Sequence, residues 1–307
     1  MFGNLAIYRV IRPFTLALAC LASLAASPCA HAAGERAQDY RGGRTQDIVC
    51  GEMNLRFYGV ELTSGSTGVV ARAGGKVLFR AEAAFGGYDL GQAQVLRDFP
   101  ARGATTLLVS VGNGGSCCTE THILTRGDTG MAYAGVTSNR SRAGAEQRAD
   151  DPAGALFCHD GFFANYYVSD GKADIIMYPG SHAAVERFLV FDNGHWRADR
   201  PGEFRERYLA LADADMRACA DPAGYLRAQP GLRAVPGDQL REMAGEVRLC
   251  KAVEAAYHAM MAGESAEQCL ARLNAALPPS HSLLAPKVLA DVRKAVAGFN
   301  PVERRRI

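Results

Sequence analysis

The chain has 307 residues, of which 48% are hydrophobic, so it can bury one large core or two smaller ones. Its 34 basic and 32 acidic residues give a net charge of +2. This balance gives no electrostatic reason to expect a nucleic acid or an anionic lipid surface as a partner.

The N-terminus has the pattern of a secretory signal peptide. A segment with Arg9 and Arg12 and no acid precedes the apolar run TLALACLASLAA, and Ala30 and Ala32 form an A-x-A cleavage site. The apolar run is too short to span a bilayer. We therefore expect cleavage after Ala32, a periplasmic or secreted chain and no transmembrane anchor. The alternatives are an uncleaved anchor and a lipoprotein modified at Cys20.

The segment after the signal peptide shows the pattern of antiparallel β-structure. Short runs of β-branched and aliphatic residues are separated by Gly, Asp, Asn or Ser, as turns require. In GVVARAGGKVLFRAE, two such runs surround AGG, which predicts a β-hairpin. Between Val136 and Ala155 the apolar periodicity disappears, and we expect a long exposed loop there.

Two strand-rich segments share one outline and suggest a duplicated sheet unit. ATTLLVSVGNGGSCCTETHILTRGD and KADIIMYPGSHAAVERFLVFDNG each contain an apolar run, a Gly/Ser-rich loop and a second apolar run, with Thr106 and Asp174 at equivalent positions. Any two hairpins share this outline, so the duplication is one of two alternatives. Parts of both segments resemble the FG-GAP type of β-propeller repeat. The first copy lacks the acidic turn of that repeat, so we assign no family.

After Trp196 the spacing of apolar residues changes to three and four, which is typical of helices. We expect a long helix with Asp238 at its N-cap and Gly263 after its end, followed by a helix that opens with a capping box of Ser265 and Gln268. A last helix then starts near Pro286, a residue tolerated in a first turn.

Strands followed by helices indicate an α+β fold. It consists of an N-terminal, mainly antiparallel β domain and a C-terminal α-helical bundle. We place the signal peptide at residues 1–32, a disulfide-stitched β domain at 33–200 and the helical domain at 201–307. The boundary between the last two falls near Arg197 to Glu203.

Cysteine usage predicts disulfide bonds. The signal peptide holds two of the nine cysteines, and the other seven are Cys50, Cys117, Cys118, Cys158, Cys219, Cys250 and Cys269. Exposed thiols tend to pair in an oxidising compartment, and an odd number leaves at least one unpaired. Neighbouring cysteines of an extended chain point to opposite faces, so we expect Cys117 and Cys118 to bind Cys50 and Cys158, in an order left open.

The three remaining cysteines lie in the predicted helices. If the helices on either side of Gly263 form a simple hairpin, Cys250 and Cys269 are offset by roughly 10 Å along the helix axes. A disulfide needs Cα atoms within about 7 Å, so this pair is disfavoured. We expect Cys219 to bind one of the two, and the other to be a buried free thiol.

The GNGGSCCTETH stretch raises the question of a catalytic thiol. A nucleophilic cysteine needs a thiolate and a base, and His122, His159 or His195 could supply the base for Cys118. The flanking strands provide no helix dipole, so disulfide formation is favoured over catalysis. CHDGFF and VSDGKADIIM lack the spacing of zinc and calcium sites, so we expect no metal and no cofactor.

These observations favour an exported, non-enzymatic binding or interaction protein, such as an inhibitor of a secreted or envelope enzyme, whose partner is another envelope or secreted protein. Gly114, Gly115, His195 and Trp196 are the candidate binding residues. A protein-binding module predicts an exposed apolar or aromatic patch near its loops. The alternative is an envelope-acting hydrolase or a thiol enzyme using Cys118. A structural envelope component is the third reading.

Overall fold

A computed structural model describes residues 38–39, 47–48, 54–65, 68–82, 93–112, 119–128, 130–138, 145–177, 183, 185–229, 232 and 235–305. The predicted signal peptide lies outside these residues. So do five of the predicted site residues, namely Cys50, Gly114, Gly115, Cys117 and Cys118.

The strands form four sheets, and nearly all of their pairings are antiparallel. The first sheet has five strands in the order β1 (Gln38–Asp39), β3 (Asn54–Phe57), β4 (Val60–Gly65), β5 (Gly68–Ala73) and β6 (Lys76–Glu82). The second has six strands in the order β16 (Val302–Arg305), β10 (Gly130–Ser138), β9 (Thr119–Gly127), β8 (Thr105–Gly112), β7 (Ala93–Arg97) and β2 (Asp47–Ile48). The third consists of β11 (Ala155–Asp160), β14 (Val185–Asp192) and β15 (His195–Ala198). The fourth pairs β12 (Tyr167–Ser169) with β13 (Asp174–Ile176).

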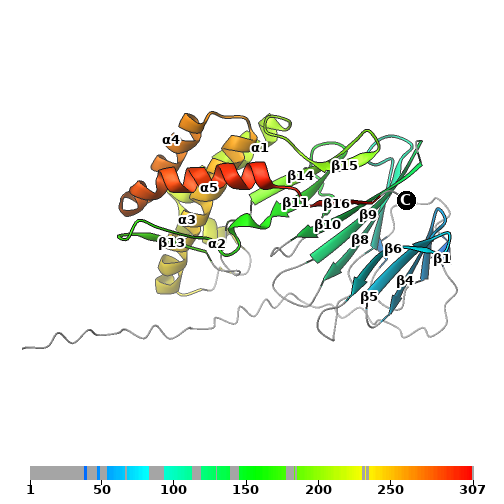
Figure 1. The fold of residues 1–307 in the computed structure, drawn as a ribbon. Helices are drawn as coiled ribbons and strands as arrows, with labels where there is room; N and C mark the ends of the chain where they lie inside the picture. The colour runs from blue at the N-terminus through cyan, green and yellow to red at the C-terminus, as the bar shows by residue number, and fades with distance from the viewer. Residues whose placement is uncertain are drawn as a thin grey trace, which may run out of the picture.

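The helices follow the strands, as the sequence predicted. They are α1 (Arg205–Ala220), α2 (Pro222–Ala228), α3 (Gly237–Met261), α4 (Ala266–Ala276) and α5 (Ala285–Gly298). Two 3-10 helices, η1 (Gly161–Phe163) and η3 (Pro279–Leu284), complete the described elements. The fold is therefore α+β, with the helices at one end of the molecule and the two largest sheets at the other (Figure 1). None of the described helices has the length and apolarity needed to cross a membrane.

The three larger sheets and the helices form successive layers, and alternating residues of β8 show why. Leu107 and Val109 enter the core shared with the five-stranded sheet, whereas Leu108 enters the core shared with the three-stranded sheet. A strand buried on both faces reads as a continuous apolar run, which explains the sequence TTLLVSV. The helices cover the other face of the three-stranded sheet, and the stacked sheets do not form the blades of a propeller.

The duplication suggested by the sequence is not present in the fold. β8 and β9 pair as a hairpin, but β13 pairs with β12, while β14 pairs with β11 and β15. β13 has only three residues, and a tight turn between Asp170 and Ala173 joins it to β12. The segments that begin near Thr106 and Asp174 therefore do not form equivalent hairpins.

Local signals in the sequence predicted several turns and caps correctly. Gly74 and Gly75 both have positive φ in the turn between β5 and β6, a conformation that glycine adopts without strain. The capping box of Ser265 and Gln268 opens α4, and Gly263 follows α3 with φ +84. Asp238 was expected at the N-cap of α3, but the cap is Pro236, two residues earlier, so Asp238 lies in the first turn.

The predicted boundary coincides with the connection between β15 and α1, yet the core does not stop there. One buried cluster contains Phe157 and Phe188 of the third sheet together with Tyr208 and Val253 of the helices. The C-terminal region is also not wholly helical, because β16 pairs with β10 of the six-stranded sheet. The chain thus returns from α5 to the β layers (Figure 1).

Candidate functional site

A buried polar network around Arg187 joins the third sheet to the helices. Arg187 on β14 is 1% exposed, and its Nε donates to Asp199 Oδ1 at 2.7 Å. Its Nη2 donates to the Asp199 carbonyl at 2.9 Å, and its Nη1 to the Tyr257 hydroxyl at 2.8 Å. Tyr257 on α3 donates in turn to Asp160 Oδ2 at 2.7 Å, and Tyr208 on α1 donates to Asp199 Oδ2. The network therefore connects β11, β14, α1 and α3.

The protonation states in this network follow from burial and from its hydrogen bonds. Burial alone would lower the pKa of Arg187, but Tyr257 and Asp199 raise it above its usual value, so the guanidinium stays charged. Burial raises the pKa of Asp199 and of Asp160, opposed by Arg187 and by the Tyr257 hydroxyl respectively. Burial also raises the pKa of Tyr208 and Tyr257 well above the ordinary value, so both remain donors.

A groove of about 510 Å³ opens beside this network. It lies between the β15–α1 connection, the C-terminal end of α5 and the end of α3. Arg187 and Asp199 contribute to its wall, and Met260, Val296 and Phe299 give it an apolar side. The Phe299 ring lies over the Arg187 guanidinium at 4.2 Å, a cation–π contact that fixes this wall.

Arginines dominate the polar lining of the groove. Arg197 is neutralised, because it bonds Asp192 Oδ2 at 3.0 Å and the two oxygens of Glu203 at 2.7 and 2.9 Å. The hydrogen bonds from Arg197 lower the pKa of Glu203. Arg200 and Arg293 are exposed, and neither guanidinium has a hydrogen bond or ion pair with another residue in the described part of the chain.

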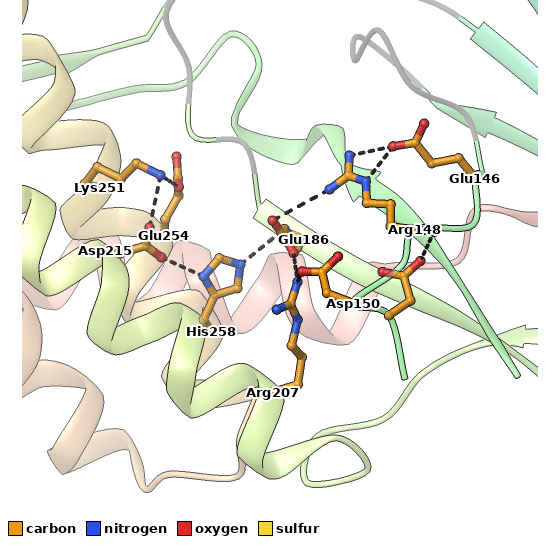
Figure 2. A network of polar contacts seen from close by, with 10 residues as sticks. Glu146, Arg148, Asp150, Glu186, Arg207, Asp215, Lys251, Glu254 and His258 are labelled. Carbon is orange, nitrogen blue, oxygen red and sulfur yellow. Dashed lines mark hydrogen bonds and ion pairs between the residues drawn. The ribbon is translucent and has the colours of Figure 1, made fainter. Parts of the chain in front are cut away.

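A second charged network ties the segment before β11 to the rest of the molecule (Figure 2). Arg148 contacts Glu146 at 2.6 Å and Glu186 of β14 at 3.9 Å. Arg207 on α1 contacts the same Glu186 at 3.5 Å and Asp150 at 2.9 Å. In the described part of the predicted loop, residues 145–154 form no helix or strand and several are exposed, while ion pairs hold the segment against β14 and α1. Residues 139–144 of the predicted loop lie outside the described part of the chain.

The histidine in this network is a fully bonded structural residue. His258 is 1% exposed, and its Nε2 accepts the Glu186 backbone N–H at 3.1 Å. Since Nε2 is an acceptor, the proton lies on Nδ1, which donates to Asp215 Oδ2 at 2.7 Å. Lys251 also bonds Asp215 at 3.0 Å, next to Glu254 (Figure 2). Burial alone would raise the pKa of Asp215, but the bonds from His258 and Lys251 lower it.

The cysteines within the described residues are buried free thiols. They are Cys158, Cys219, Cys250 and Cys269. The predicted bond from Cys158 to the vicinal pair is thus not formed in this structure, and neither is the bond from Cys219 to Cys250 or Cys269. Burial raises the pKa of Cys158 well above its ordinary value, which makes this thiol a poor nucleophile.

Trp196 belongs to the core and not to an exposed binding surface. It is 1% exposed, stacks against Phe99, and its Nε1 donates to Thr125 Oγ1 at 2.9 Å. The neighbouring His195 is exposed at the start of β15. His122, a candidate base, is buried, with its ring 3.8 Å from that of Phe79.

An exposed apolar pair lies on the two-stranded sheet. Tyr167 and Ile176 are opposite each other on β12 and β13, and they are 62% and 43% exposed. They are exposed aromatic and aliphatic side chains of the kind that a protein-binding surface requires. The sequence did not single out either residue.

The sequence also missed Arg187, which lines the groove, and Tyr257, which holds the Arg187 guanidinium from α3. Tyr257 fits the apolar stripe of α3, so its hydroxyl carried no separate signal. Arg187 was detectable, because it stands inside the apolar run VERFLVFD, where a buried charge needs a partner. Among the described residues, no group of three or more His, Cys, Asp and Glu side chains could hold a metal ion.

Comparison with models of known protein families, with curated proteins and with solved structures finds no match.

Proposed function

We propose that this chain is an exported binding protein that holds its ligand, without chemical conversion, in the groove beside Arg187. The observation that carries this proposal is the groove of about 510 Å³ and its wall, which the buried network makes rigid. This volume falls in the range of small-molecule sites. Export is the part of the proposal that rests on the sequence, through the predicted signal peptide.

The construction of the groove favours binding because its walls are fixed before a ligand arrives. Arg187 is bonded to Asp199 and Tyr257, and Tyr208 bonds the remaining oxygen of Asp199. Side chains held in this way lose little conformational entropy on binding. Elements far apart in the chain therefore present one preorganised surface.

The polar groups that line the groove, and those of the charged network around Glu186, are arranged for structure and not for proton transfer. Both ring nitrogens of His258 are bonded, to Glu186 and Asp215, which leaves no free base at that position. Asp199 supplies the single carboxylate among the lining residues, and Arg187 and Tyr208 occupy its oxygens. A glycosidase-like site would need two carboxylates facing one cavity. The Cys118 hypothesis stays a prediction, because that residue lies outside the described part of the chain.

A thermal-shift screen tests the proposal. The mature protein is melted with a panel of small acids, amines, sugars and neutral aromatic compounds, each at about 10 mM. A compound with a dissociation constant near 1 mM would stabilise the native state by about 1.4 kcal/mol, or a few degrees in Tm. We expect at least one compound to do this for the wild type.

Two variants test whether the rise in Tm comes from binding in the groove. Ala297→Trp places a large side chain in the groove, and Ala290→Trp places the same side chain on α5 about 10 Å away, outside the lining. We expect the shift to disappear in A297W and to persist in A290W. Asn300→Trp is a second filling variant, at another exposed lining position, in case A297W melts abnormally. A panel without any stabilising compound, or shifts that survive both filling variants, would refute the proposal.

A further inference from the structure

We infer that the groove selects an anion that carries an apolar body, namely a carboxylate or a phosphate monoester joined to an aliphatic or aromatic group. This inference rests on the proposed function, since it names the ligand class of the same groove. Three features carry it: two guanidinium groups at the rim that have no partner among the described residues, further N–H groups on Arg187, and an apolar side wall.

The unpaired guanidinium groups are Arg200, on the β15–α1 connection, and Arg293, on α5. Both line the groove, and neither guanidinium has an ion-pair or hydrogen-bond partner among the described residues. The Arg200 backbone N–H donates to Glu203 Oε2 at 3.0 Å, which leaves its guanidinium available. The contrast with Arg197 is informative, because two carboxylates already bind that side chain. A guanidinium group binds the two oxygens of a carboxylate or phosphate in a bidentate geometry. A ligand with an amine or a neutral group cannot form this pair of charged hydrogen bonds.

Arg187 adds donors at the wall. A guanidinium has five N–H groups. Three of them donate to Asp199 Oδ1, to the Asp199 carbonyl and to the Tyr257 hydroxyl. The other two have no acceptor in the described part of the chain, and Arg187 lines the groove. Each guanidinium nitrogen already has one acceptor, so an anionic oxygen at this wall would add a bond to the second N–H of Nη1 or Nη2.

The apolar side of the groove is the reason to expect an apolar body on the anion. Met260, Val296 and Phe299 line the groove next to the arginines. Inorganic anions would leave this surface exposed to water, whereas an aromatic or aliphatic body would cover it. Phe299 already lies over the Arg187 guanidinium, so the polar and apolar parts of the wall meet at this residue.

The local charge balance is compatible with an anion. The four arginines of the lining face the carboxylates of Asp192, Asp199 and Glu203, which leaves an excess of one positive charge. Arg200 and Arg293 carry two positive charges, and Arg197 with its two carboxylates carries one net negative charge. The C-terminal end of α5 opposes an anion with roughly half a negative charge, which is less than the excess of one positive charge.

Calorimetric titration with four matched compounds tests the inference. Benzoate and phenyl phosphate carry an anionic group on a phenyl ring, while benzyl alcohol and benzylamine carry a neutral and a cationic group on the same ring. We expect the two anions to bind at least about tenfold more tightly than the other two, and to weaken several-fold when sodium chloride is raised from about 0.02 to 0.5 M. Binding of benzoate alone or of phenyl phosphate alone assigns the anion to a carboxylate or to a phosphate monoester.

Charge-removing variants identify the residues responsible. Arg200→Gln and Arg293→Gln should each weaken anion binding about tenfold, and the double variant should abolish it. Lys294→Gln removes a positive charge from the next residue of α5, which does not line the groove, and should change the affinity less than about twofold. All three positions are exposed, and melting temperatures check that each variant is folded.

The possible outcomes separate the inference from the proposed function. If benzyl alcohol or benzylamine binds as tightly as the anions and A297W blocks it, the groove binds ligands but the anion inference is wrong. If the anions bind the R200Q/R293Q double variant as they bind the wild type, the inference is also wrong. If none of the four compounds binds, the inference is wrong, and the thermal-shift panel decides the proposed function separately.

Discussion

Loss of the Arg187 guanidinium should destabilise the native chain strongly. Arg187→Met keeps an unbranched side chain of similar length but removes all three hydrogen bonds to Asp199 and Tyr257. The Asp199 carboxylate, 3% exposed, would then keep one side-chain donor, the Tyr208 hydroxyl. Breaking one partner of a buried ion pair costs about 3–5 kcal/mol. This is a large part of the roughly 5–15 kcal/mol that stabilises a typical domain.

The second partner provides an internal check. Asp199→Asn in the R187M background removes the charge that the first change leaves unpaired. We therefore expect the double variant to lose about 1–3 kcal/mol less than the sum of the two single variants. Arg200→Met is the matched control, because this arginine is exposed and has no ion pair among the described residues. It should change the free energy of unfolding by less than about 0.5 kcal/mol.

Urea denaturation measures these effects. Trp196 is the single tryptophan of the chain and is 1% exposed, so its fluorescence reports on the core next to the third sheet. Circular dichroism at 222 nm follows the helices, and coincident transitions justify a two-state treatment. A loss below about 1 kcal/mol in R187M, or additive losses in the double variant, would refute the view that Arg187 and Asp199 form a buried structural pair.

Two further predictions concern the helices and the thiols. The folded pKa of Asp215 lies below its unfolded value of about 3.9, so its ionised form stabilises the fold above that pH, and the contribution is lost as the pH falls through the folded pKa. Asp215→Asn should thus have a lower free energy of unfolding than the wild type at pH 7. Urea titrations should show this difference shrinking below about pH 4, and a difference that grows on acidification would contradict the prediction. Cys158 should react with a thiol reagent at pH 8 only as fast as the chain unfolds, because burial raises its pKa. Rapid labelling, or a disulfide at Cys158 in non-reduced peptide maps of the exported protein, contradicts this placement.

Local patterns predicted the elements whose geometry depends on neighbouring residues. The turn at Gly74 and Gly75 depends on positive φ, and the capping box of Ser265 and Gln268 depends on a spacing of three residues. Both can be recognised within one short segment. The change from strands to helices near Arg197 is also local, because the spacing of apolar residues changes there.

The candidate site could not be predicted in this way, because its parts come from distant segments. Arg187 and Arg293 are about a hundred residues apart, and only the packing of α5 against the β15–α1 connection brings them to one groove. β16 was missed for the same reason, since the pairing of Val302 with Val136 joins remote parts of the chain. Four of the predicted site residues, Gly114, Gly115, Cys117 and Cys118, lie instead in the GNGGSCC stretch, whose local composition gives no information on long-range packing.

Amide mapping by NMR tests the central claim most directly. The ¹⁵N-labelled mature protein is titrated with the panel compound that raises its Tm most. We expect chemical-shift changes to concentrate at Met260, Val296, Ala297 and Asn300, and A297W to remove them. Changes concentrated at the exposed pair of Tyr167 and Ile176, or spread over the sheets without a maximum at the groove, would contradict it.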